Sequence, residues 1–455
     1  MNSHPSISLM TPGRGLQRGP ALVAIALLLA SPGLRAEQPE STALDLKGTV
    51  AFALENNFTI RQARERIKQQ EGVEIQVRAR QIPNVSAAGS YTGNSREISS
   101  YSVAPEAAWS IGLQARQVLY AGGGVRSSVK SAQLAREAAM LELEGVINQQ
   151  LLLVRIQFYA VLLAKEQIKV QENNVNLFEQ QLKDAKNRFE AGTTSNFEVL
   201  RAEVALANGQ PPLIQARNDY RIAIEQLRQL VGFVGGRTAT VTNAPEFVGT
   251  LEIGQPVTYQ LPDALAAAHA HRPELQQLAK LTDAGEQNVK STRAGYFPEV
   301  DLVGGYSVIR SPFSVAWDNR VSGWTAGVQA QWNIFDGRAT AGRVIQARSQ
   351  LEQAKLSQSA TTLAIEVQVR QAYSSLIEAW ELVQASGKTV EQAQEALRLA
   401  NVRYGAGTAT QLDVLSSQVY LIQAQLNQLQ ANYGYHVSLA TMRQAIGLAD
   451  EFVHS

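Results

Sequence analysis

The sequence of 455 residues contains no cysteine. Disulfide bonds, thiolate nucleophiles and cysteine-ligated metal sites are therefore excluded, and a lipid cannot be attached through an N-terminal cysteine. The chain also lacks an excess of charge of one sign, because 41 Lys and Arg balance 40 Asp and Glu. Proteins that bind nucleic acid usually carry a basic patch and a clear positive balance, so we expect no nucleic-acid partner.

Long hydrophobic runs are also missing. The one marked run, at residues 21–30, follows two arginines and precedes small residues up to Ala36. This pattern predicts a secretory signal peptide over residues 1–36, and its removal would take away three arginines and change the net charge from +1 to −2. Beyond it we find no apolar run of about 18 residues, the length of a transmembrane helix, so we expect any entry into a membrane to be made by strands.

What the sequence does contain is a duplication. Residues 188–200 return as residues 403–415, and the same offset of 215 residues aligns the rest without a gap. Each copy follows one helical pattern and opens another, with Gly where a left-handed cap is favourable and Thr or Ser where the next helix can be capped, so we interpret it as the turn of a helical hairpin. The predicted organisation is an N-terminal lead-in at 37–48, repeat one at 49–232, a linker at 233–263, repeat two at 264–447 and a C-terminal tail at 448–455.

Alternation of apolar and polar residues predicts two strands in each repeat. The four strands cover residues 83–93, 107–119, 298–309 and 323–335, joined within each repeat by polar loops at 94–106 and 310–322. Aromatic residues lie near the strand ends, as they do at the two surfaces of a membrane barrel. These candidate membrane-interface residues are Tyr91, Trp109, Tyr306 and Trp324.

Helical spacing predicts the remainder of both repeats. Residues 124–190 and 338–404 contain no proline and predict two helices of about 100 Å each. Apolar residues spaced four and three apart predict a coiled-coil seam in both. The seams consist of Ile147, Leu151, Val154, Phe158 and Val161, and of Ile365, Val369, Ala372, Leu376, Ala379 and Val383. The other predicted helices are 49–80, its counterpart from Ala264 toward Pro298 with an interruption at Pro273, a return helix at 196–231 broken by Pro211 and Pro212, and a return helix at 411–446.

Four strands per chain are too few for a membrane barrel, because a barrel with a filled interior needs roughly eight. The hydrocarbon core of a bilayer holds no water that could hydrogen-bond the backbone groups of an open strand edge. The sheet must nevertheless close. Three chains would supply twelve strands. The predicted fold class is therefore an internally duplicated α+β membrane protein, in which long α-helical coiled-coil hairpins form a tube and four β-strands per chain contribute to a trimeric 12-stranded β-barrel.

This arrangement resembles the TolC family of outer membrane efflux proteins. The resemblance rests on the two hairpin turns, on the strand-to-helix junctions at 119–123 and 334–338, and on the gapless duplication. It implies a trimeric exit duct in the outer membrane of a Gram-negative-type cell, with a large periplasmic portion, serving a tripartite efflux or type I secretion system. The implied partners are a homotrimer, a periplasmic membrane fusion adaptor, an inner membrane pump of the RND, ABC or MFS type, and outer membrane lipid.

The resemblance also implies roles for residues of the two turns. Gly192, Thr193, Gly407 and Thr408 match the periplasmic tip that contacts the adaptor, while Tyr404, Asp413 and Glu198 match the pore constriction or gate. Some family members have further charged residues where this chain has Ala409 and Ser416, so we expect fewer ion pairs at the gate. Both glycines would also cap helices in any such hairpin, and an acid is favoured in the first turn of any helix.

Other patterns point to no chemistry. Residues 122–124 are Gly-Gly-Gly but are not followed by Gly-Lys-Ser or Gly-Lys-Thr, so a bend explains them better than a phosphate-binding loop. His269 and His271 do not share a helix face and have no completing ligands. We therefore expect no catalytic residues, no metal site, no cofactor and no enzyme activity. The alternative function is that of a soluble periplasmic coiled-coil structural or adaptor protein, and the substrate stays open.

Overall fold

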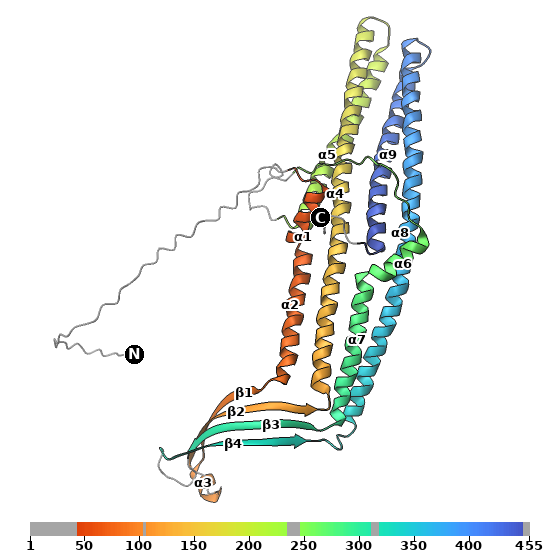
Figure 1. The fold of residues 1–455 in the computed structure, drawn as a ribbon. Helices are drawn as coiled ribbons and strands as arrows, with labels where there is room; N and C mark the ends of the chain where they lie inside the picture. Colours follow the sequence, from red (N-terminus) through yellow and green to blue (C-terminus); the bar gives the residue numbers. More distant parts are fainter. Residues whose placement is uncertain (1–42, 103–105, 234–245, 311–317, 449–455) are drawn as a thin grey trace, which may run out of the picture. The chain divides into compact units, whose positions relative to one another are not determined.

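The computed structural model describes residues 43–102, 106–233, 246–310 and 318–448 (Figure 1). The predicted signal peptide and residues 449–455 of the predicted tail lie outside the described residues. Residues 234–245 of the linker and 311–317 of the second polar loop do so as well.

Long helices and one four-stranded sheet make up the described chain. The first half contains α1 (Leu46–Asn56), α2 (Phe58–Arg78), β1 (Asn84–Gly93), α3 (Arg96–Ser102), β2 (Ala107–Ala121), α4 (Gly124–Glu190) and α5 (Asn196–Val231). The second half contains α6 (Leu261–His271), α7 (Pro273–Arg293), β3 (Glu299–Arg310), β4 (Arg320–Gln331), α8 (Ala339–Gly405) and α9 (Gln411–Ala445). Short 3-10 turns, η1 (Ala79–Gln81) and η3 (Ala294–Tyr296), lead into β1 and β3. The predicted fold class of long helical hairpins with four strands in the chain is confirmed.

The two longest helices, α4 and α8, contain 67 residues each. Their predicted seams are buried except at Ile147 and Val383, which are partly buried, because side chains spaced three and four apart fall on one helix face. Leu151 and Phe158 of α4 pack with residues of α1 and α5 and with Phe247, which follows the first half. Val369 and Leu376 of α8 pack with residues of α6 and α9. Each half of the chain therefore has its own main core cluster.

Helix α4 contains an apolar stretch of a length that was not predicted beyond the signal peptide. One 18-residue window has a mean hydropathy of 1.4, so by length and composition alone this helix could cross a membrane. Gln and Arg residues interrupt the run without lowering its average below that of a spanning helix. Leu151, Val154 and Phe158, which raise the hydropathy of α4, are buried in the core. These three residues belong to the 33% of the apolar window that is buried within the chain.

The prediction that Pro211 and Pro212 break the first return helix is wrong. Helix α5 runs through both prolines without interruption. Each proline removes one backbone donor, so the carbonyls four residues earlier, at Ala207 and Asn208, lose their helical partners. Both of these residues are exposed, and water can satisfy their carbonyls. The cost of the two prolines is therefore smaller than in a buried helix.

The first predicted helix, over residues 49–80, is instead two helices. Asn57 separates α1 from α2: its side-chain oxygen accepts a hydrogen bond from the Ile60 N–H (3.0 Å), and its Nδ2 donates to the Leu230 carbonyl (2.7 Å) at the end of α5. Such side-chain bonds offer the backbone an alternative to continuing a helix. No proline lies near Asn57, so the sequence alone does not predict this break.

The equivalent break in the second half was predicted from Pro273. Arg272 separates α6 from α7, and it is nearly fully buried. Its guanidinium donates to the carbonyl of Gln444 (3.0 Å), near the end of α9. Asn57 and Arg272 thus make equivalent contacts: each side chain donates from a helix break to a carbonyl near the end of the return helix, α5 or α9.

The sheet has the strand order β1-β2-β3-β4, with every neighbouring pair antiparallel (Figure 1). Strand β4 ends at Gln331, so the prediction that it continues to residue 335 is wrong. The alternation of apolar and polar residues continues to residue 335, although the strand does not. The indole N–H of Trp332, the first residue after the strand, donates to the Tyr296 carbonyl (3.1 Å). Helix α3 lies in the first polar loop, where no helix was predicted.

Tight turns join the strands to the long helices. Gly122 and Gly123 have φ values of 56° and 78° between β2 and α4. A Cβ on Gly122 would lie 2.7 Å from the Cβ of Phe297, so glycine is required there by space as well as by conformation. These contacts explain the glycine run as a bend. In the second half, Gly337 and Arg338 take the same left-handed conformation before α8.

Candidate functional site

The two hairpin turns have the same backbone hydrogen bonds. At the first, Gly192 has a φ of 72° and its N–H donates to the Phe189 carbonyl (2.9 Å), while the Thr193 N–H donates to the Arg188 carbonyl (2.9 Å). At the second, Gly407 has the same φ, and the Gly407 and Thr408 amides donate to the carbonyls of Tyr404 (3.1 Å) and Arg403 (2.8 Å). This pair of bonds around a left-handed residue is the Schellman motif that ends helices.

Both threonines after the glycines reinforce their turns. The hydroxyls of Thr193 and Thr408 donate to the carbonyls of Arg188 (2.9 Å) and Arg403 (3.1 Å). The glycines and threonines predicted to form the tip are all exposed, and no atom lies within 4 Å of where a Cβ on either glycine would be. Both turns are therefore exposed in the single chain.

The starts of the two return helices differ. In α9, Thr410 and Asp413 form a capping box: the Thr410 N–H and hydroxyl both donate to the Asp413 carboxylate (2.8 Å each), and the Asp413 N–H donates to the Thr410 hydroxyl (3.3 Å). The backbone bond and then the hydroxyl bond from Thr410 hold the pKa of Asp413 below its ordinary value. In α5 the Ser195 side chain makes no cap bond, and Thr194 donates to the Glu198 carboxylate instead (3.1 Å).

A small cluster joins the two hairpins. The half-buried Tyr404 of α8 donates from its hydroxyl to the Glu198 carboxylate of α5 over 3.5 Å, which is long for such a bond. The Arg188 guanidinium of α4 lies 4.7 Å from the centre of the Tyr404 ring, within range of a cation-π contact. Burial, followed by the negative charge of Glu198, raises the pKa of Tyr404.

The structure thus brings two of the three predicted gate residues together. Tyr404 meets Glu198, whereas the Asp413 carboxylate is bonded to Thr410 and is exposed. Arg188 was not predicted as part of this cluster. Its only signal in the sequence is that Arg occupies both position 188 and position 403.

Behind the tip, a buried amide network connects α4 with α9. Gln418 is 1% exposed and donates from Nε2 to the Asn174 side-chain oxygen (3.0 Å). Gln181 in turn donates to the Gln418 side-chain oxygen (2.6 Å). A buried amide without partners is costly, so these bonds favour one register of α4 against α9.

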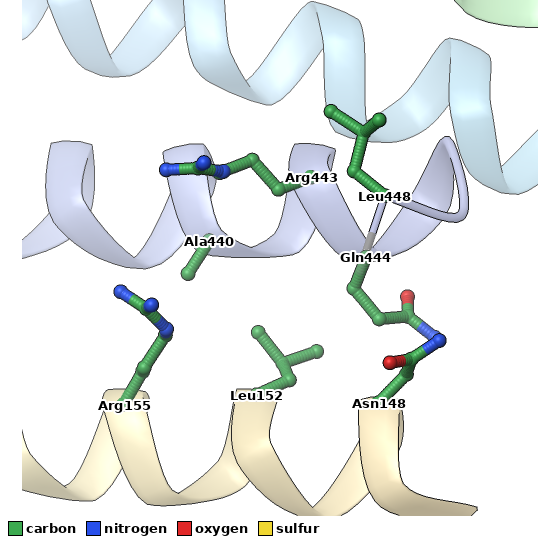
Figure 2. A pocket seen from close by; sticks show the side chains of 7 residues that line it. All are labelled: Asn148, Leu152, Arg155, Ala440, Arg443, Gln444 and Leu448. Carbon is green, nitrogen blue, oxygen red and sulfur yellow. The ribbon is translucent and has the colours of Figure 1, made fainter. Parts of the chain in front are cut away.

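A second interhelical site lies further along the same two helices (Figure 2). Arg155 of α4 points toward α9, where Ala440 lies between it and the Arg443 side chain, and Asn148 and Gln444 approach each other from the same two helices. This pocket has room for about one water molecule. It is a packing junction rather than a substrate site.

The strand register places apolar residues of all four strands on one face. Directly opposed residues of an antiparallel pair share a face, so Leu113 lies on the same side as Ala87 and Tyr306. That face carries Val85, Ala87, Tyr91, Trp109, Ile111, Leu113, Val300, Leu302, Tyr306, Trp324, Val328 and Ala330. The other face is mostly polar or small but includes apolar residues, among them Val303, Ile309 and Val321. Its polar residues are Ser86, Ser90, Ser110, Gln114, Arg116, Asp301, Thr325 and Gln329. This is the pattern of a membrane barrel strand.

The four predicted interface aromatics form two cross-strand pairs. Tyr91 opposes Trp109, and Tyr306 opposes Trp324, in the part of the sheet away from the helices. A second aromatic group at the helix end of the sheet was not predicted as such. Its exposed members are Tyr120, Tyr296, Phe297, Trp332 and Phe335. Trp324 lies in β4 and Trp332 directly follows its last residue, so their separation of eight residues spans at most about 26 Å, close to the height of a barrel's apolar band.

The sheet has two open edges in the single chain. Strands β1 and β4 each pair on one side only among the described strands. An open edge offers unpaired backbone groups to another strand. In a bilayer such an edge has to be paired, so one chain alone is incomplete.

Sites for metal or cofactor chemistry do not emerge from the geometry. Within the described residues, no group of three or more His, Asp or Glu side chains could hold a metal ion. His269 instead lies 3.3 Å from the Glu366 carboxylate on α8. The carboxylates at the turns take part in capping and interhelical contacts.

Comparison with known proteins gives a consistent result. A model of the family described as outer membrane efflux protein matches residues 50–233 and 264–448. The outer membrane efflux protein BepC of Brucella suis biovar 1 is 24% identical over 436 residues, covering 94% of this chain and 90% of that protein. The alkaline protease secretion protein AprF of Pseudomonas aeruginosa is 24% identical over 315 residues, covering 67% of this chain and 63% of that protein.

A solved structure has the same fold. The outer membrane protein VceC of Vibrio cholerae superposes with a TM-score of 0.73 at 18% identity, covering 89% of this chain and 96% of that one. The resemblance to outer membrane channels predicted from the turns, junctions and duplication is confirmed, and an outer membrane exit duct is favoured over a soluble coiled-coil protein. The chain belongs to the outer membrane efflux protein family, whose members include the TolC-like channels.

Proposed function

We propose that this chain is one subunit of a trimeric exit duct, in which three four-stranded sheets close into a twelve-stranded barrel. The observation that carries this proposal is the sheet: it has an apolar face, a polar face and two open edges within one chain. Closing the sheet with two further copies pairs both edges and turns the apolar face to lipid. The internal division into two repeats, with a linker between them, belongs to the same proposal.

The helices would continue the barrel as a periplasmic tube. Each of α4 and α8 starts beside the sheet and ends at a hairpin turn about 100 Å away. We assign the turn residues Gly192, Thr193, Gly407 and Thr408 to contact with a periplasmic membrane fusion adaptor. Their exposure and the matching backbone bonds of the two turns support this assignment. An inner membrane pump of the RND, ABC or MFS type would supply the cargo.

The gate is assigned to the cluster between the hairpins. Tyr404 and Glu198 connect α8 to α5, so separating the hairpins would break their contact. Asp413 caps α9 with its carboxylate exposed, and three copies would place three negative charges around the tip. Ala409 and Ser416 add no charge there, which limits the gate to few ion pairs. No catalytic role is assigned to any residue.

The cargo can be a small molecule or a protein. BepC is named for efflux and AprF for protease secretion, and this chain is 24% identical to each, over 436 and 315 residues. Photo-crosslinking from position 193 or 408 in growing cells tests the adaptor assignment, because the attached protein identifies the system. Recovery of a periplasmic adaptor is expected. Crosslinks only to other outer membrane proteins would contradict the assignment, and a crosslinker at the exposed position 217 on α5 serves as the control.

A further inference from the structure

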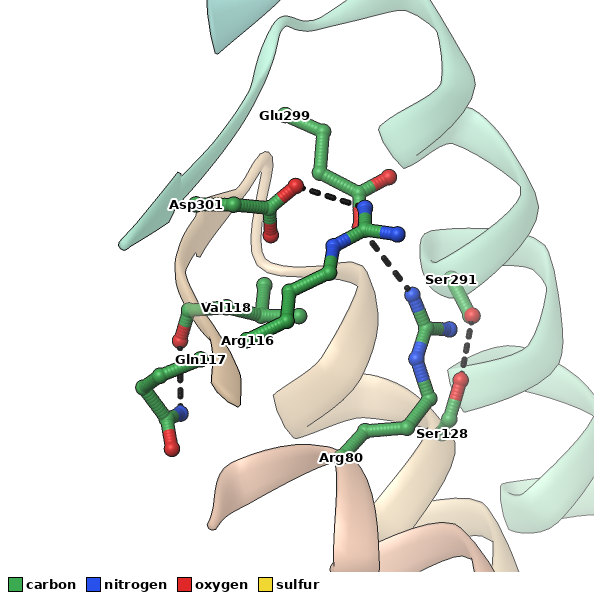
Figure 3. A network of polar contacts seen from close by, with 8 residues as sticks. All are labelled: Arg80, Arg116, Gln117, Val118, Ser128, Ser291, Glu299 and Asp301. Atoms are coloured by element: carbon green, nitrogen blue, oxygen red, sulfur yellow. Dashed lines mark hydrogen bonds and ion pairs between the residues drawn. The ribbon is translucent and has the colours of Figure 1, made fainter. Parts of the chain in front are cut away.

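The polar face of the sheet carries a charged network near the start of the long helices (Figure 3). The Arg116 guanidinium of β2 donates from Nη2 to the Asp301 carboxylate of β3 (2.5 Å) and lies 3.7 Å from Glu299. Arg80, in the turn before β1, lies 3.5 Å from the same Glu299. The network thus ties the sheet to the helix end of the first half.

The arginines of this network are more exposed than the acids they contact. The side chain of Arg116 is 60% exposed and that of Arg80 is 53% exposed, against 7% for Asp301 and 37% for Glu299. Asp301 even has one carboxylate oxygen, Oδ1, that is buried without a hydrogen-bond partner. The carboxylates therefore lie close to the sheet surface, while the guanidinium groups extend further into solvent.

A groove continues from this network onto α8. Arg80 and Glu299 line it together with Arg343, Gln331 and Asn333, and so do Gly124 and Val125 in the first turn of α4. Arg343 is again more exposed than its acidic neighbour Asp336, at 64% against 25%, over a distance of 3.8 Å. The amides and the positive end of the α4 dipole add further attraction for a negative group.

The guanidiniums retain donors for a ligand. Within the described part of the chain, Arg116 uses only Nη2 toward its acids, and Arg80 likewise uses only Nη2. A guanidinium presents five N–H donors in a planar fork that fits the two oxygens of a carboxylate or phosphate. The unused donors of both side chains border the same space beside Glu299 (Figure 3).

We infer that this groove, lined by Arg80 and Arg343 with Gln331 and Asn333 and bordered by Arg116 through its contact with Glu299, binds oxyanions, the carboxylate or phosphate groups of passing cargo. The inference rests on the proposed duct, because the polar sheet face lines the lumen only if the barrel closes. Three chains would then place nine arginines in a ring where barrel and helices meet. Charged rings of this kind set the ion preference of a channel.

Binding can be measured without conduction. Titrating inorganic pyrophosphate into the detergent-purified native oligomer, with calorimetric detection, should give saturable binding that weakens about tenfold or more in the double variant Arg80→Gln/Arg343→Gln, since each charge-assisted contact contributes strongly. Arg96→Gln removes one positive charge from an ion pair at the far end of the sheet, between β1 and β2, and should leave the affinity unchanged. Equal affinity in wild type and the double variant, or no binding at all, would overturn the inference.

A second variant tests the effect of the Arg116 guanidinium on ion preference without changing the net charge of the chain. Arg116→Gln alone would leave the buried Asp301 unpaired and could prevent folding, so it is combined with Asp301→Asn, which keeps the total charge constant. In planar bilayers under a KCl gradient, this pair should lower the anion-to-cation permeability ratio about twofold or more. If the variant channel conducts with an unchanged anion-to-cation permeability ratio, the anion groove is contradicted but the duct is not. Pyrophosphate binding without any conduction in wild type would contradict the duct and leave the groove standing.

Discussion

Two glycines with the same backbone conformation should respond very differently to alanine. Gly192 and Gly232 both follow a helix with φ near 75°, at 72° and 76°. An added Cβ on Gly192 would meet no atom within 4 Å, whereas on Gly232 it would lie 2.3 Å from the backbone oxygen of Asn56. Gly232 caps the C-terminal end of α5 and packs directly against the backbone at the break between α1 and α2.

The expected magnitudes follow from these distances. A left-handed alanine costs about 1 to 2 kcal/mol, and Gly192→Ala should cost only this. Gly232→Ala adds a clash with backbone that cannot rotate away, and overpacking of this kind costs about 1 to 3 kcal/mol more. The second half offers a matched pair: a Cβ on Gly407 is free, while one on Gly447 would lie 2.9 Å from the backbone of Arg272 and His271.

Thermal unfolding of the purified protein, followed by circular dichroism at the helical band, measures the difference. Gly232→Ala should lower the unfolding temperature at least twice as much as Gly192→Ala, or fail to accumulate. Asparagine tolerates the left-handed region, so Gly192→Asn should be milder than Gly192→Ala while Gly232→Asn stays severe. Equal shifts for Gly192→Ala and Gly232→Ala would refute the claim that α5 closes tightly against the helix break.

Three further predictions concern the tip and the sheet. The folded-state pKa of Asp413 is lowered by its bonds to Thr410, so its stabilisation of α9 is present above the unfolded pKa of about 3.9 and is lost as the pH falls below it. Hydrogen-exchange protection in the first turn of α9 should drop over that acidic range in wild type, and should be low and nearly pH-independent in Asp413→Ala. In bilayer recordings, Asp413→Asn should reduce cation preference and Tyr404→Phe should raise closed-state leakage; if both variants match wild type, these residues only cap and pack. Fluorescence of Trp324 and Trp332, each kept as the single tryptophan with the others replaced, should be quenched by brominated lipid near the headgroups, and quenching absent at either position would remove it from the membrane boundary.

The sequence predicted the elements whose signal is local and repeated. The seam through Leu151 and Phe158 is readable because helical spacing directly encodes a buried face. The glycines at 192 and 407 are readable because only a left-handed cap explains Gly between two helical patterns. The duplication strengthened both, since each pattern occurs twice.

What the sequence did not predict depends on contacts between distant segments. The break at Asn57 arises from a bond to the end of α5, more than 170 residues away. Helix α5 continues through Pro211 because the carbonyls left without partners are exposed, and the sequence does not reveal their exposure. Arg188 joins the tip cluster only because α4 and α8 end side by side, which places it over the Tyr404 ring.

The central claim is that strands β1 and β4 of different chains pair to close one barrel. Because the chain has no cysteine, cysteines introduced into the polar faces of β1 at Ser86 or Ser90 and of β4 at Thr325 or Gln329 would be its only thiols. Oxidation of outer membranes carrying one such β1–β4 pair should yield covalent dimers and trimers, with trimer as the largest species, while two cysteines both in β1 should yield none. Disulfides formed only within a chain, or a ladder extending beyond trimer, would contradict the twelve-stranded barrel.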